Sequence, residues 1–124
     1  MKCKIQKNIL QGMLSKVQGF TDRKTTLPIL SHVLLETSSE GFKIKATDLH
    51  TSIQVRAQCD VEEQGACAIN CKSFFDLIRE LPDDKLTLFT EERLRAHVVV
   101  GDFKTHLNIM DPEEFPMIDF GERE

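Results

Sequence analysis

The side chains best suited to catalysis are scattered through this sequence. The four histidines are His32, His50, His97 and His106. They fall in predicted strands and turns, and His97 and His106 each stand at a polar-face position of an alternating strand, which favours surface histidines over catalytic ones. Adjacent acids occur only in predicted turns and in the C-terminal segment, where solvent suits them better than proton transfer. No nucleophile-elbow, zinc-protease or phosphate-loop motif is present, so the sequence argues against an enzyme.

The cysteines do not form a recognisable metal site. They are Cys3, Cys59, Cys67 and Cys71. Cys67 and Cys71 stand four apart, but there is no second pair and no histidine at ligand spacing, and a structural zinc ion normally needs four ligands. Cys3 and Cys67 fall on alternating apolar strand patterns. We therefore expect buried, reduced thiols, with no metal and no other cofactor.

The cations are the one charged group that suggests a ligand. The formal net charge is −4, but residues 1–30 carry +5 and residues 31–124 carry −9. Such a polarised chain can turn a basic face toward phosphates while its remainder stays acidic. The candidate phosphate contacts are Arg23, Lys24, Lys7, Lys16, Lys72 and Arg79. The alternative is a chance bias on an ordinary solvated face.

Length and apolar content limit the class further. The 124 residues are enough for one domain with a core, and 40% apolar with 29% charged residues is ordinary globular composition. The longest apolar runs, such as 33–35 and 98–100, are far too short to span a bilayer. The N-terminus lacks a hydrophobic signal core, so we expect a cytoplasmic protein without membrane contact.

The cations must be positioned by helices and loops that the apolar pattern predicts. A strand over 2–6 leads into a helix over 7–17, whose apolar residues recur at helical spacing and form one stripe. The stripe consists of Ile9, Leu10, Met13, Leu14 and Val17. Lys7 stands at the helix entrance, and Lys16 lies on the polar face. A loop over 20–26 carries Arg23 and Lys24, and strands over 28–37, 42–46 and 53–57 predict an antiparallel meander.

The same order of elements then restarts. A strand over 66–70 leads into a helix over 71–81, which Pro82 ends, and strands follow over 86–89, 94–100 and 103–109. Residues 3–17 align with 67–81 without a gap, and only Ile9 of the first stripe meets a polar residue, Ser73. We predict an α+β fold with a duplicated βαβββ unit and two helices packed on antiparallel sheet. Asp76 and Glu80 dilute the cations of the second helix.

Four segments together resemble a known family. Residues 26–35 (TLPILSHVLL) and 46–49 (ATDL) resemble the TLPILSNVLL and GTDLE segments of bacterial beta clamps. Residues 74–76 (FFD) with 81–82 (LP), and residues 111–116 (DPEEFP), resemble two further segments in the same order. The chain is thus similar to the first domain of the bacterial DNA polymerase III beta subunit, with the DNA clamp fold. It departs at Arg23-Lys24, which is more basic than in some members, and at His50, which replaces a glutamate.

The resemblance implies a non-catalytic role. Members are homodimeric rings of three-domain subunits that encircle duplex DNA, touch its backbone without reading sequence, and tether the replicative polymerase. By this resemblance residues 1–110 are the first clamp domain and residues 111–124 begin a linker. The chain would then be a piece of a longer protein, whose absent domains bind the DNA polymerase III core and the clamp loader. The implied dimer contacts are Arg95, Lys104, Thr105 and Leu107.

Two alternatives stay open. One is a scaffold domain of the same duplicated fold that does not bind DNA, and the other is a small enzyme with an unrecognised site. In addition, Thr105 stands where the family often has a large apolar residue, which puts the strength of the implied dimer contact in question.

Overall fold

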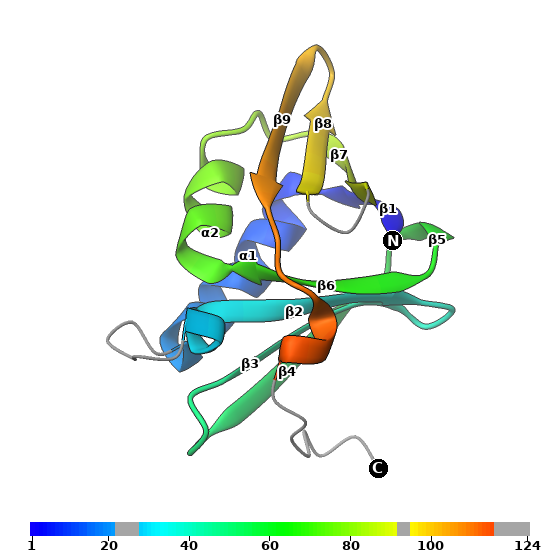
Figure 1. Ribbon diagram of the computed structural model, residues 1–124. Coiled ribbons are helices and arrows are strands. Elements are labelled where there is room, and N and C mark those ends of the chain that lie inside the picture. Colours follow the sequence, from blue (N-terminus) through cyan, green and yellow to red (C-terminus); the bar gives the residue numbers. More distant parts are fainter. Residues whose placement is uncertain (22–27, 92–94, 116–124) are drawn as a thin grey trace.

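The computed structural model describes residues 1–21, 28–91 and 95–115 (Figure 1). The first half contains β1 (Lys2–Gln6), α1 (Lys7–Val17), the 3-10 helices η1 (Gln18–Phe20) and η2 (Pro28–Ser31), β2 (His32–Ser38), β3 (Gly41–Thr47), β4 (Ser52–Ala57) and β5 (Asp60–Glu63). The second half contains β6 (Gly65–Asn70), α2 (Cys71–Arg79), β7 (Lys85–Glu91), β8 (Arg95–Val100), β9 (Phe103–Asn108) and the 3-10 helix η3 (Pro112–Glu114).

The strands form two antiparallel sheets in which the two units exchange their first strands. One sheet has the order β5-β1-β7-β8-β9 and the other β4-β3-β2-β6. β1 therefore joins the strands of the second unit, and β6 joins those of the first. Cys3 and Ile5 of β1 stand opposite Leu88 and Leu86, and their repeat mates Cys67 and Ile69 of β6 stand opposite Leu35 and Val33. This matched register confirms the predicted duplication.

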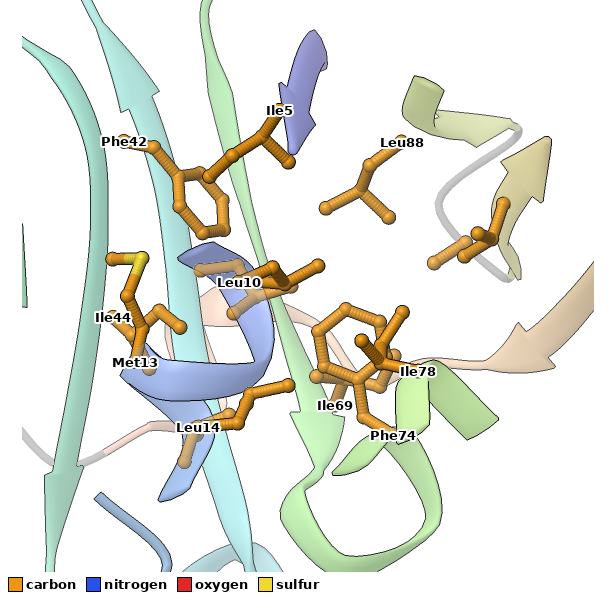
Figure 2. Close-up of a cluster of buried hydrophobic side chains, with 14 of the residues drawn as sticks. Ile5, Leu10, Met13, Leu14, Phe42, Ile44, Ile69, Phe74, Ile78 and Leu88 are labelled. Carbon is orange, nitrogen blue, oxygen red and sulfur yellow. The ribbon is translucent and has the colours of Figure 1, made fainter. Parts of the chain in front are cut away.

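The two helices lie side by side and share one core with both sheets (Figure 1). Leu10, Leu14 and Val17 of α1 are fully buried, as the helical stripe predicts. Figure 2 shows α1 side chains between Phe42 of β3 and Phe74 of α2. Each fully buried side chain of this size contributes about 1.5–3 kcal/mol through the apolar surface it removes from water. Burial of one stripe leaves the opposite side of each helix exposed.

Helix α2 ends earlier than predicted. The sequence predicts a helix over 71–81, but the helix closes at Arg79 and its last turn tightens. The backbone N–H groups of Glu80 and Leu81 donate to the carbonyls of Leu77 and Ile78, three residues back. Pro82 is the physical reason, because the residue before a proline is disfavoured in the helical region.

Three further features of the first unit differ from the prediction. Pro28 begins η2 instead of a strand, since a proline fits the first turn of a helix, where its missing N–H is not needed. Strand β5 was not predicted, because Val61 is its only apolar residue. Ile9 is 44% exposed and lines a hollow beside β1 and β5, so it does not belong to the buried stripe. Its repeat mate is the polar Ser73.

The segment after β9 returns to the other sheet. The backbone N–H of Met110 donates to the carbonyl of Ala68 at 2.8 Å, and the reverse bond is 3.2 Å long. Phe115 is 4% exposed, so the described chain packs on the domain up to its last residue. The linker boundary at residue 110 stays a prediction. Neither described helix is long and apolar enough to cross a membrane.

Candidate nucleic-acid interface on the paired helices

Four of the six predicted phosphate contacts lie on the two helices. Lys7 and Lys16 belong to α1, and Lys72 and Arg79 belong to α2. Lys16, Lys72 and Arg79 are exposed, whereas Lys7 is half-buried. The remaining two, Arg23 and Lys24, lie outside the described residues. The helices thus bring cations from both repeats to neighbouring surfaces.

The two cations of α2 share one carboxylate. Nζ of Lys72 lies 2.8 Å from Oδ2 of Asp76, and Nη2 of Arg79 lies 3.4 Å from Oδ1 of the same residue. The spacings of four and three residues put all three side chains on one helix face. The Lys72 hydrogen bond, then the charges of Lys72 and Arg79, hold the pKa of Asp76 below its usual value. The aspartate therefore stays ionised and offsets one of the two positive charges.

The cations of α1 are not bridged in this way. Within the described part of the chain, no carboxylate lies within ion-pair distance of Lys7 or Lys16. Lys16 stands in the last turn of α1, where a positive charge also matches the helix dipole. The backbone N–H of Lys7 donates to the carbonyl of Asp84 at 2.9 Å, which ties the start of α1 to the segment after α2. Lys16 is therefore the most available described cation on the helices.

A shallow polar hollow joins the end of α1 to the start of α2. Its lining residues are Gln18, Thr21, Ser31, Asn70, Lys72 and Ser73. Oδ1 of Asn70 accepts a hydrogen bond from the N–H of Ser73 at 2.9 Å and so caps α2. Thr21 is the last described residue before the segment that carries Arg23 and Lys24. The hollow thus links Lys72 to the point where that segment begins.

Other cations of the basic first segment are held elsewhere. Lys2 and Lys4 of β1 lie 3.6 and 3.5 Å from the carboxylate of Glu62. Their side chains stand on the outer face of the five-stranded sheet, since their neighbours Cys3 and Ile5 point into the core. The excess of positive charge in residues 1–30 is therefore divided between two surfaces. The sequence pattern alone did not separate them.

The predicted dimer contacts lie at the edge of the five-stranded sheet. Lys104, Thr105 and Leu107 belong to β9, the edge strand, and Arg95 begins the neighbouring β8. Arg95 and Lys104 are exposed, while Thr105 and Leu107 are half-buried on the inner face. An open edge presents unpaired backbone groups that another chain can pair with. Whether a second subunit pairs there stays a prediction.

The histidines and cysteines form no catalytic arrangement in the described residues. No group of three or more His, Cys, Asp or Glu side chains among them is placed to hold a metal ion. The ring of His97 stacks on the ring of Phe89, with 4.8 Å between the ring centres, and its centre lies 5.7 Å from that of His106 on the paired strand. Cys67 is buried as predicted, and burial raises the pKa of its thiol to about 12. Such a thiol stays protonated and inert.

The sequence identifies the cations but not all of their partners. Asp76 does more than dilute the charge of α2, because its carboxylate contacts both Lys72 and Arg79. The spacing of these three residues was a sufficient signal, because residues three and four apart are neighbours on a helix. The pairing of Lys2 and Lys4 with Glu62 had no such signal, since it depends on the unpredicted β5.

Comparison with known proteins gives a consistent result. A family model described as DNA polymerase III beta subunit, N-terminal domain, matches residues 1–119. A beta sliding clamp of Chlamydia pneumoniae is 33% identical over 118 residues, 95% of this chain and 32% of that protein. The Helicobacter pylori beta clamp solved with a DNA ligase peptide has a TM-score of 0.90 at 29% identity, over 96% of this chain and 33% of that chain. Caulobacter crescentus pol III beta has a TM-score of 0.90 at 25% identity, over 98% and 33%.

Two interlocked repeats, with paired helices backed by two antiparallel sheets, define a domain of the clamp class. The fold predicted from the repeat and from the resemblance is therefore confirmed. The chain belongs to the DNA polymerase III beta subunit family, and its match is to the N-terminal domain of that family. It spans about a third of the length of the three relatives described above.

Proposed function

We propose that this chain is the N-terminal domain of a sliding clamp that encircles duplex DNA and confers processivity on a replicative polymerase. The role is non-catalytic and cytoplasmic. The observation that carries the proposal is the pair of side-by-side helices, whose exposed faces hold Lys16, Lys72 and Arg79. A helix surface with few cations and no base-reading constellation suits weak contact with phosphates, which permits sliding.

In the full-length protein, two subunits of three domains each form a closed ring with the helices toward the hole. Arg23 and Lys24 head the phosphate contacts, and the helix cations Lys7, Lys16, Lys72 and Arg79 each contribute less. The dimer contact uses β9, through Lys104, Thr105 and Leu107 together with Arg95 of β8. The edge position of β9 in its sheet supports this assignment.

The protein partners bind through domains beyond this chain. We infer that they include the DNA polymerase III core and the clamp loader. The Helicobacter pylori relative was solved with a DNA ligase peptide. By analogy, the full-length protein also takes short peptides from other DNA-processing enzymes.

A salt titration of duplex binding by the full-length ring tests the proposal. With three simultaneous phosphate contacts, the logarithm of affinity falls with the logarithm of salt at a slope of about −3. The double substitution Arg23→Ala with Lys24→Ala flattens the slope by about two, equally on two unrelated duplexes.

Lys4→Ala is the matched control, because Lys4 is a cation of the same segment that contacts Glu62 on the outer sheet face. It leaves the slope unchanged. A ring that binds neither duplex in a salt-dependent way would instead be a scaffold of the same fold. A strong preference for one duplex would also contradict backbone-only contact.

A further inference from the structure

The internal repeat supplies a direct comparison between the two helix faces. Under the alignment of residues 3–17 with 67–81, Lys72, Asp76 and Arg79 of α2 correspond to Asn8, Gly12 and Ser15 of α1. All three α1 residues are exposed, and a Cβ added at Gly12 would meet nothing within 4 Å. The two sets of residues thus occupy corresponding positions in the repeat. α1 is neutral at these positions, whereas α2 carries a positive, negative, positive strip.

The strip on α2 is held together by its central acid. Asp76 uses both carboxylate oxygens, one toward Lys72 at 2.8 Å and the other toward Arg79 at 3.4 Å. The guanidinium of Arg79 also lies 5.6 Å from the ring centre of Phe75 on the preceding turn. Both cations are thereby kept along the helix surface. A phosphate that approaches α2 therefore competes with the carboxylate for both cations.

We propose that Asp76 is the residue that limits how strongly α2 contacts DNA phosphates. The proposal rests on the proposed function and specifies how the same surface is regulated. The bridged strip has a net charge of +1, and its cations are already paired. A passing phosphate therefore gains only a brief contact. Binding to DNA phosphates then depends mainly on cations outside the strip, such as Lys16.

Glu80 provides a matched control on the same helix. It is exposed, it follows Arg79 directly, and no cation of the described residues lies within ion-pair distance of it. Asp76→Asn and Glu80→Gln each remove one negative charge with little change in shape. Only the first releases Lys72 and Arg79. Comparing the two variants separates release of the cations from a simple change in net charge.

The test is a salt titration of duplex binding by the full-length ring carrying each substitution. Asp76→Asn makes one additional phosphate contact available, so its slope is steeper than that of the unsubstituted ring by about 0.9. The ratio of the two affinities then changes about eightfold for each tenfold change in salt. Glu80→Gln leaves the slope unchanged. Adding Lys72→Ala and Arg79→Ala to Asp76→Asn removes the gain.

Each other outcome overturns the idea. Suppose that the unsubstituted ring binds duplex in a salt-dependent way and that Asp76→Asn leaves the slope unchanged. This result refutes the proposed role of Asp76 but not the proposed function. Equal effects of Asp76→Asn and Glu80→Gln would mean that net charge, not pairing, matters. A ring without any salt-dependent binding overturns the proposed function and this role with it. Thermal unfolding of each variant checks that the helix is intact, as we expect because neither side chain belongs to the buried core.

Discussion

Gly41 provides the sharpest test of the packing between β3 and β4. It starts β3 with φ 114°, and a Cβ at this position would lie 2.7 Å from the backbone carbonyl oxygen of Ala57. A residue held in such a sparsely populated conformation costs about 1–3 kcal/mol. Forcing a methyl group against the backbone of the paired strand costs about 1–3 kcal/mol more. We expect Gly41→Ala to lower the free energy of unfolding by about 3 kcal/mol or more.

Two other glycines separate these contributions. Gly101 also has a positive φ, 56°, but a Cβ there would meet nothing within 4 Å, so Gly101→Ala should cost only about 1–2 kcal/mol. Gly12 lies on the open face of α1, and Gly12→Ala should stabilise by about 0.8–1.0 kcal/mol because alanine favours the helix. Urea unfolding followed by circular dichroism measures all three. Equal costs for Gly41→Ala and Gly101→Ala would refute the predicted clash with Ala57.

Three further predictions concern the core, the sheet edge and the thiols. Leu10→Ala should lower the free energy of unfolding by about 2–5 kcal/mol because Leu10 is fully buried. Ile9→Ser should change it by less than about 1 kcal/mol because Ile9 is exposed. Similar losses for the two variants in urea unfolding would contradict the exposure of Ile9. Leu107→Asp should weaken the dimer of the full-length protein, since it puts a charge on the inner face of the edge strand; an unchanged dissociation constant by analytical ultracentrifugation would argue against β9 as the contact. A thiol reagent should modify Cys59 before Cys67, since Cys59 is only half-buried while burial raises the pKa of the Cys67 thiol to about 12. Mass spectrometry of the labelled native protein reports the order of modification. Labelling of both thiols at the same rate would contradict this prediction.

The helices and most strands were predictable because their signals are local. The stripe through Leu10 and Val17 marks α1 to within a residue, and only the last turn of α2 differs from prediction. The alignment of the two repeats also indicates which residue of the stripe is exposed. Ile9 was the single stripe residue without an apolar partner in the alignment, and it is the one that the structure leaves exposed.

The exchange of first strands was not predictable from the same patterns. Alternation along β1 says that Cys3 and Ile5 point inward, but not that their neighbours are Leu88 and Leu86. Pairing partners far apart in sequence leave no local signal. Strand β5 is a second case, because its position depends on β1 and on the hydrogen bond from Thr37 to the carbonyl of Glu63, not on its own composition.

The candidate site was predictable as a set of residues but not as an electrostatic surface. The sequence indicates which cations lie on helices, because the polar face follows from the apolar stripe. Lys2 and Lys4 belong to the same basic first segment, but their pairing with Glu62 on another surface depends on β5, which was not predicted. For Lys72 and Arg79 the partner is local, and helical spacing alone would have identified it.

The exchanged strands also constrain how the domain can fold. The ammonium group of Met1 lies 3.4 Å from the hydroxyl of Thr90, a residue 89 positions later in the chain. On a ribosome, β1 can therefore find its central partner β7 only after most of the domain has been made. Neither repeat can complete a sheet alone, so a half-length chain is left with an unpaired strand edge. We expect contacts between distant residues to make folding slow and to make the domain unfold as one cooperative unit.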